Sequence, residues 1–131
     1  MCIRDRGATV LVYSRGSVPA TTLGMLQKGI TSVTAASKTT YTAVAGDQIV
    51  VDTVANPVTI TLPASPAVGD EVTIMDGSAS NGFATNNCII DRNGSPVQGV
   101  GSNITLVLNN QCVTLIYANA TKGWLYKSTN Q

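Results

Sequence analysis

The chain has 131 residues, enough for one domain, and a formal net charge of +1 with 11% charged residues. It has no basic stripe to attract a nucleic-acid backbone and no apolar run of about 18 residues to cross a membrane. It also has no His, which excludes a Ser-His-Asp or Cys-His catalytic set and nearly every zinc or haem site, so we expect a non-catalytic protein without a cofactor.

The N-terminal residues are predicted to be an arm rather than a domain. Residues 1–6 (Met-Cys-Ile-Arg-Asp-Arg) resemble the translation of an adapter used to prepare sequencing libraries. We interpret them as a scar, and we expect the natural chain to continue upstream of Gly7. Residues 8–13 are a short apolar run with strand character, residues 14–29 resemble a linker, and residues 30–38 should be extended. Residues 7–38 are therefore predicted to form an extended arm or stalk.

From residue 39 onward, apolar and polar residues alternate in short runs separated by turn residues. β-Branched residues, which fit a pleated sheet better than a helix, are abundant, with 17 Thr, 15 Val and 9 Ile. Alternation indicates strands with one buried and one wet face. Eight strands are predicted, over residues 39–44, 48–53, 58–62, 71–75, 88–92, 104–108, 112–118 and 124–127. Their spacing predicts an all-β fold over residues 39–128, an antiparallel β-sandwich or a jelly-roll-like module.

The same alternation predicts which side chains form the core. The predicted core residues are the apolar members of the strands: Ile49, Val51, Val58, Ile60, Leu62, Val72, Ile74, Ile89, Leu106, Leu108, Val113, Leu115 and Trp124. Two Gly-Asp pairs, at residues 46–47 and 69–70, each lead into a strand. Two copies are too few to indicate a solenoid, so we interpret them as similar turns within one sheet system.

The carboxylates allow several interpretations. Asp47 and Asp70 are expected to accept backbone N–H bonds in their own turns, as Asp does. Two carboxylates facing each other across a cleft could serve as a glycosidase pair. Asp76 with Ser78 or Asn81 could bind Ca²⁺ through oxygen ligands, although the spacing matches no EF-hand.

Four further residues are candidates for a ligand site, an interface or a disulfide. Trp124 and Tyr126 are two positions apart on one predicted strand, where they could stack on a sugar, pack in the core or line a subunit interface. Cys88 and Cys112 are either a disulfide or two small apolar side chains, and geometry decides between these.

Several stretches of the chain together resemble a known viral module. They are residues 41–47 (Tyr-Thr-Ala-Val-Ala-Gly-Asp), 51–53, 58–66 (Val-Thr-Ile-Thr-Leu-Pro-Ala-Ser-Pro), 68–70, 83–87, 91–95, 113–117 and 123–124. On these stretches, residues 41–126 resemble a small β module of tail-fibre and other virion structural proteins of tailed phages, notably marine ones. The resemblance implies a component of a tail fibre, a head fibre or a capsid decoration, and it transfers no catalytic residues.

We therefore expect a fibre or surface module located in a virion or outside the cell. Residues 7–38 hold too few apolar side chains for a core of their own, so an identical neighbour is expected to cover them. The fibre resemblance implies that this assembly is a homotrimer, and a host-surface glycan is a possible further partner. Two alternatives remain: a carbohydrate-binding module of a secreted bacterial protein, and a β-sandwich subunit of an extracellular filament that donates residues 8–13 as a strand.

Overall fold

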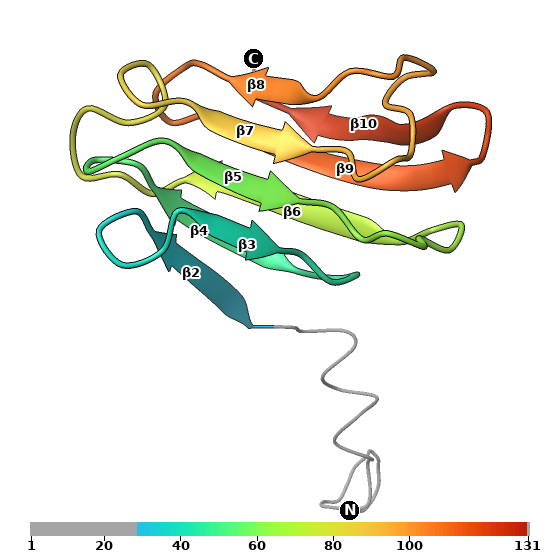
Figure 1. Ribbon diagram of the computed structural model, residues 1–131, viewed down its shortest axis with the longest axis horizontal. Coiled ribbons are helices and arrows are strands. Elements are labelled where there is room, and N and C mark those ends of the chain that lie inside the picture. The colour runs from blue at the N-terminus through green and yellow to red at the C-terminus, as the bar shows by residue number, and fades with distance from the viewer. Residues whose placement is uncertain (1–28, 131) are drawn as a thin grey trace, which may run out of the picture.

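The computed structural model describes residues 29–130, which form two β-sheets packed face to face (Figure 1). One sheet has five strands in the order β10-β9-β6-β4-β2, and the other has four in the order β3-β5-β7-β8. The strands are β2 (Ile30–Thr34), β3 (Thr40–Thr42), β4 (Gln48–Asp52), β5 (Val58–Thr61), β6 (Glu71–Asp76), β7 (Cys88–Asp91), β8 (Ile104–Leu106), β9 (Cys112–Asn119) and β10 (Gly123–Thr129). No helix occurs in this part of the chain, so the predicted all-β sandwich is confirmed.

From β2 to β7 the chain winds alternately between the two sheets. β2, β4 and β6 are parallel neighbours in one sheet, and β3, β5 and β7 are parallel neighbours in the other. Direction reverses only later, where β8 pairs with β7, β9 with β6 and β10 with β9 in antiparallel fashion. The predicted antiparallel or jelly-roll-like arrangement is therefore wrong, because both sheets are mixed. Alternation reports which face of a strand is buried but not the direction of its neighbour.

The two Gly-Asp turns occupy corresponding places in this winding. Gly46-Asp47 precedes β4 and Gly69-Asp70 precedes β6, and β4 and β6 are parallel neighbours. The two glycines have φ values of 89° and 95°, a backbone conformation that side chains with a Cβ rarely adopt. The Gly46 N–H donates to the carbonyl of Glu71 at 2.7 Å, so consecutive coils are joined at this end. The turns thus lie in one sheet, as expected, and they mark successive coils of it.

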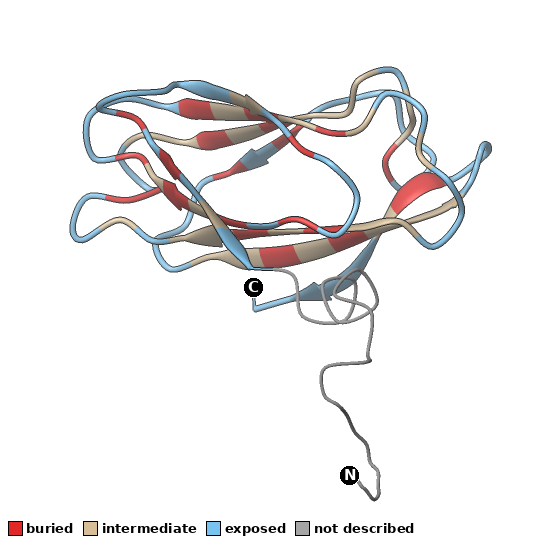
Figure 2. Ribbon diagram, turned by 90° about the horizontal axis from the view of Figure 1, so that it is seen from below, coloured by how far each residue is buried: buried red, intermediate tan, exposed pale blue. Residues whose placement is uncertain are grey.

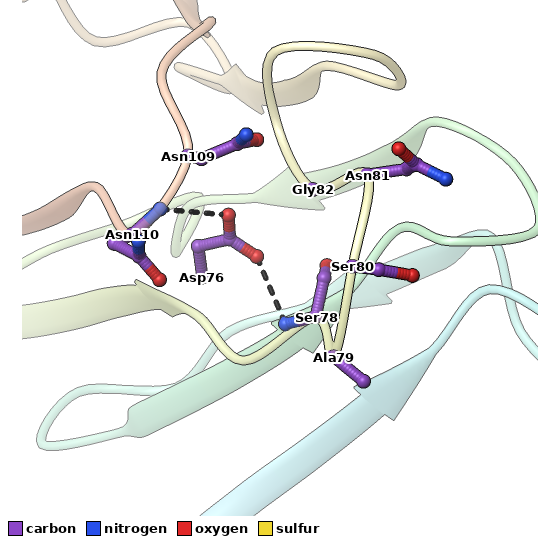
Figure 3. Close-up of a pocket in the computed structure, with 8 residues that line it drawn as sticks. All are labelled: Asp76, Ser78, Ala79, Ser80, Asn81, Gly82, Asn109 and Asn110. Atoms are coloured by element: carbon purple, nitrogen blue, oxygen red, sulfur yellow. Dashed lines mark hydrogen bonds between the residues drawn. The ribbon is translucent and has the colours of Figure 1, made fainter.

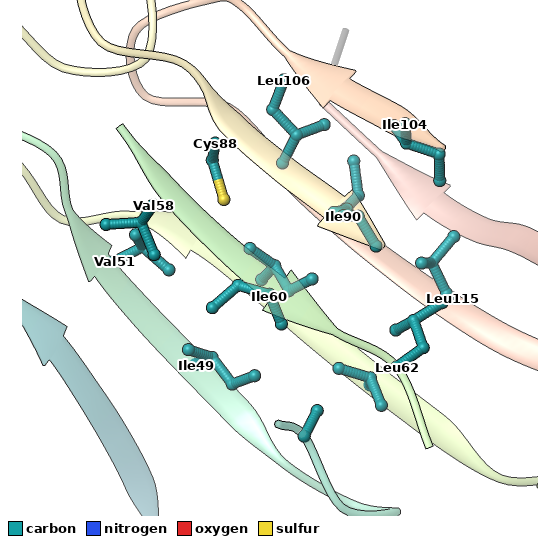
Figure 4. Packing of buried hydrophobic residues seen from close by; sticks show 14 of the residues in the cluster. Ile49, Val51, Val58, Ile60, Leu62, Cys88, Ile90, Ile104, Leu106 and Leu115 are labelled. Carbon is teal, nitrogen blue, oxygen red and sulfur yellow. The ribbon is translucent and has the colours of Figure 1, made fainter. Parts of the chain in front are cut away.

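The core lies between the sheets. Buried residues occur on strands of both layers (Figure 2), and their apolar side chains lie between the layers (Figure 4). Eleven of the thirteen predicted core residues are buried. The exceptions are Ile89, which is half-buried, and Leu108, which is 43% exposed in the turn after β8. The remaining buried apolar residues are Val33, Ala35, Ala43, Phe83, Cys88, Ile90, Val97 and Ile104. In β7 the buried positions are Cys88 and Ile90. The prediction of Ile89 was wrong because two adjacent Ile residues place an apolar side chain on each face, so the sequence does not show which face is buried.

The sandwich begins at β2, before the predicted boundary at residue 39. β2 pairs with β4 along its whole length, and Val33 and Ala35 belong to the core. The boundary between arm and module was wrong because β2 reads Ile-Thr-Ser-Val-Thr, with a single buried aliphatic residue and no clear alternation. The predictions for residues 1–6 and 7–28, including the strand at 8–13, lie outside the described residues.

The two edges of the five-stranded sheet are built differently. β10 has two register shifts, and residues 96–98 lie along it: the Trp124 N–H donates to the Pro96 carbonyl at 2.9 Å, and the Gln98 N–H donates to the Trp124 carbonyl at 2.8 Å. Gly123 makes this contact possible, because a Cβ at this residue would overlap the Pro96 carbonyl. At the opposite edge, β4 is the one described strand that pairs with β2, and β2 lies on the same side of the molecule as β3 (Figure 1).

Candidate functional site

A small polar pocket lies at the end of the sandwich where β6 and β8 finish (Figure 3). Its volume is about 190 Å³, and its lining residues are Asp76, Ser78, Ala79, Ser80, Asn81, Gly82, Asn109 and Asn110. Asp76 is the last residue of β6, and the others come from the loop after β6 and the turn after β8. Asn81 and Asn110 have φ values of 48° and 61°, in the left-handed region that Asn tolerates better than most residues.

The Asp76 carboxylate joins the two segments that line the pocket. Its Oδ1 accepts the Ser78 N–H at 2.9 Å, and its Oδ2 accepts the N–H groups of Phe83 at 3.2 Å and Asn110 at 3.0 Å. Burial raises the pKa of this carboxyl, but the hydrogen bonds from Ser78, Asn110 and Phe83 outweigh burial and hold the pKa below its ordinary value. Asp76 is therefore ionised at neutral pH, and its charge orders both loops.

The pocket gives limited support to the Ca²⁺ interpretation. Asp76 is the only carboxylate in the lining, and both of its oxygens already accept backbone N–H bonds. Nowhere in residues 29–130 do three or more His, Cys, Asp or Glu side chains gather closely enough to hold a metal ion. Ca²⁺ takes six to eight oxygen ligands in proteins. The Asp76 carboxylate therefore serves to hold two loops together through hydrogen bonds.

Trp124 and Tyr126 do not form an exposed pair. Trp124 is fully buried in the core, where its ring meets the Tyr117 ring edge-to-face with centroids 5.6 Å apart. Tyr126 is 41% exposed, and its backbone N–H donates to Gln98 Oε1 at 3.2 Å. Burial raises the pKa of the Tyr126 hydroxyl. Of the three interpretations of this pair, the structure supports packing in the core for Trp124, and Tyr126 alone of the two remains at the surface.

The other carboxylates also brace the backbone around them. As predicted, Asp47 Oδ2 accepts the Val44 N–H at 2.9 Å, and Asp70 Oδ2 accepts the Ala67 N–H at 2.8 Å. Asp47 is almost fully buried and also accepts the Tyr41 hydroxyl at 2.9 Å. The carboxylates of these two residues therefore bond within their own turns, and they give no support to the interpretation as a glycosidase pair.

Asp52 and Asp91 follow the same pattern, and Glu71 forms an ion pair. Asp52 Oδ1 accepts the N–H of Val54, two residues later, and Asp91 Oδ1 accepts the N–H of Asn93, each at 2.9 Å. Glu71 is bound by Lys127 at 2.8 Å, and both side chains are well exposed. All six carboxylates in residues 29–130 thus have an intramolecular partner.

Side-chain amides form a second set of braces that the sequence interpretation missed. Asn86 Nδ2 donates to the carbonyls of Thr53 and Val54 at 2.9 and 3.1 Å, and so ties the loop before β7 to the loop after β4. Asn87 Nδ2 donates to the Phe83 carbonyl at 2.7 Å. The only sequence signal for these contacts is an Asn-Asn pair ahead of a strand, which also occurs in ordinary turns.

The two cysteines of the described region are free thiols. Cys88 faces the core from β7, and Cys112 is half-buried at the start of β9 in the other sheet. Burial, with a smaller contribution from the charge of Asp76, raises the pKa of the Cys88 thiol to about 12. Of the two interpretations of this pair, the structure supports separate thiols, with Cys88 packed as a small apolar side chain.

No protein-family model matches the chain, and no curated protein sequence matches it. Among residues 29–130 there is no helix that is long and apolar enough to span a membrane.

Proposed function

We propose that this chain is a non-catalytic structural component of a phage particle, most simply a fibre module or a surface module with an adhesive or decorative role. The observation that carries the proposal is the use of its ionisable side chains. All six described carboxylates are bonded within the molecule, five of them to backbone N–H groups of loops. A catalytic or metal-binding carboxylate needs oxygen lone pairs that remain available to a substrate or an ion. In residues 29–130, five of the six carboxylates serve instead to hold loops in place on the sandwich.

The resemblance of residues 41–126 to phage tail-fibre modules supports the same proposal. A particle component outside the cell must keep its shape without a ligand, and braced loops on a closely packed core favour this. Only 11% of the residues of the chain are charged, so we expect hydroxyl and amide groups of Ser, Thr and Asn to supply much of its polar surface. We also propose that the protein is located in the virion or elsewhere outside the cell.

A homotrimer is the assembly expected of such a fibre module, and sedimentation equilibrium at micromolar concentration tests it. The chain has a mass of 13.5 kDa, so a species of three times that mass is expected. A single species with the mass of one chain would refute the trimer. A dimer would leave the β fold intact but would contradict the analogy with a fibre.

The same samples distinguish the two alternative functions. A monomer that binds glycans on an array, with loss of binding in a Tyr126→Ala variant, would favour a carbohydrate-binding module. Tyr126 is the exposed aromatic side chain on β10, so it is the residue to test. Polymers that lengthen with protein concentration would favour a filament subunit.

A further inference from the structure

The outer edge of β2 has backbone groups that point away from the sandwich. The Ala35 N–H donates to the Asp52 carbonyl at 2.9 Å, so the backbone at this position bonds toward β4. Backbone direction alternates along a strand, which turns the N–H groups of Val33 and Thr31 toward β4 as well. The N–H groups of Ser32 and Thr34 then point to the other side, where no described strand pairs with β2.

Apart from the turn that follows β2, whose Ser37 and Lys38 N–H groups donate to the Thr34 carbonyl, the described residues give this edge none of the features that prevent edge strands from pairing with other strands. Such strands usually carry a bulge, a Pro or a charged residue, or a loop covers them. β10 at the far edge has register shifts, a lysine and the covering segment 96–98. β2 reads Ile-Thr-Ser-Val-Thr, pairs with β4 in unbroken register, and exposes 65% of Ile30. Among the described strands, the β2 edge is therefore the one open to pairing with a further strand in this sheet.

The preceding part of the chain has the right length to supply that strand. Successive strands of this sheet are joined by a crossover through the other sheet: residues 35–47 link β2 to β4, and residues 53–70 link β4 to β6. Residues 14–29 separate the apolar run at residues 8–13 from β2. This segment is longer than the first of the two observed connections and shorter than the second, so it can make the same kind of crossover.

We propose that residues 8–13 of this chain dock on the free edge of β2 as a parallel strand and extend the winding by one coil. Thr31 and Val33 are the inward-facing residues of β2, and Val10 and Val12 would lie beside them. The sequence offset of this pairing is larger than that of the pair Ile30↔Gln48 and smaller than that of the pair Gln48↔Thr73, which are the parallel pairings observed in this sheet. This inference does not depend on the proposed role in a phage particle.

Amide hydrogen exchange on the full chain, read at single residues by NMR, tests the proposal. The reporters are the N–H groups of Ser32 and Thr34, which exchange rapidly if the edge is free. We expect both to be protected, by the same factor across a tenfold range of protein concentration. Replacing Val10 and Val12 by Asp on the inward face should increase their exchange rates by about tenfold or more, while the amides of β4 stay protected.

The matched control places two aspartates on the opposite face of the same segment, as Thr9→Asp and Leu11→Asp. Protection of Ser32 and Thr34 should survive in this control. Rapid exchange of both amides in the unmodified chain would overturn the proposal, because the edge would then be free. Protection that rises with protein concentration would overturn it in favour of a second copy as the occupant. Protection that persists in the Val10→Asp/Val12→Asp variant would overturn it by showing that another segment covers the edge.

Discussion

The side chain of Asp76 shows how one charge can hold two loops that are distant in sequence. Its oxygens accept N–H groups from Ser78, Phe83 and Asn110, so the loop after β6 and the turn after β8 share one acceptor. Replacing Asp76 by Asn removes the charge and leaves one acceptor oxygen. We expect unfolding free energy to fall by about 1–2 kcal/mol in urea melts at pH 7, a value that allows for solvent screening at this half-buried site.

The control for this prediction is Asp52→Asn, because Asp52 accepts a single N–H, from Val54. We expect this variant to lose about 0.5 kcal/mol. The pH dependence follows from the lowered pKa of Asp76. Its contribution to stability is complete above the ordinary value of 3.8 and is lost as pH falls below it through the folded-state pKa. The difference between the unmodified chain and Asp76→Asn should therefore shrink in melts below about pH 4, and a constant difference down to pH 2 would contradict the assignment.

Substitutions at Gly123 and Gly94 distinguish the stability cost of a strained backbone from the cost of steric overlap. Both have positive φ values, 71° and 92°, but a Cβ at Gly123 would overlap the Pro96 carbonyl whereas a Cβ at Gly94 would meet nothing within 4 Å. Gly94→Ala should therefore cost about 1 kcal/mol for the left-handed conformation alone. Gly123→Ala should cost about 3 kcal/mol or more, because residues 96–98 must also move off β10. Equal losses in thermal melts would show that the contact between Gly123 and Pro96 is not tight.

At the scale of a strand, β7 provides a direct test of register. Ile90 faces the core with no exposed area, whereas Ile89 faces away and is half-buried. Ile90→Ala should reduce the free energy of unfolding by about 2–5 kcal/mol, as should Ile60→Ala and Leu115→Ala. Ile89→Ala should cost about 1 kcal/mol, since much of its side chain already contacts water. Chemical denaturation measures all four variants, and a larger loss for Ile89 than for Ile90 would reverse the assigned register.

Strand positions could be predicted from the sequence because a strand with one buried face has an apolar residue at every second position. Residues 58–62 show this best: Val58, Ile60 and Leu62 are all fully buried, and Thr59 is not. All eight predicted strands are present, with ends that differ by a few residues. The direction of the neighbours could not be read, because a parallel and an antiparallel partner both bury the same face of a strand. β2 was missed as part of the sandwich because only Val33 marks its inner face.

The same reasoning explains which parts of the candidate site could be predicted. Asp47 and Asp70 bond within three residues of themselves, so turn chemistry alone indicates their roles. The partners of Asp76 include Asn110, which is 34 residues away, and no local pattern encodes that contact. Trp124 and Tyr126 have the right spacing to share a face, but the Trp124 ring packs against Tyr117 in the core, whereas Tyr126 is 41% exposed. Spacing within one strand cannot reveal what another segment covers.

At the scale of the whole molecule, Cys88 can report on opening of the sandwich. Its thiol is fully buried between the sheets, and its pKa of about 12 leaves very little thiolate at pH 8. We expect alkylation of Cys88 to be slow in the native protein and to accelerate with urea in parallel with global unfolding. Peptide mass spectrometry after timed alkylation measures this, with the half-buried Cys112 as the comparison in the same chain. Modification of Cys88 in native buffer as fast as Cys112 would show that the layers separate locally.

The parallel winding also determines the order in which this chain can fold. Paired strands from β2 to β7 are distant in sequence, as in the pairs Ile30↔Gln48 and Val58↔Cys88, and each pair is separated by a strand of the other sheet, so none of them can nucleate as a hairpin. Among the described strands, β9 and β10 are the pair joined by a tight turn, at residues 120–122, and they are made last during synthesis. During synthesis, the strands from β2 to β7 therefore emerge before the β9–β10 hairpin with which the five-stranded sheet is completed, and their unpaired edges are exposed in that interval.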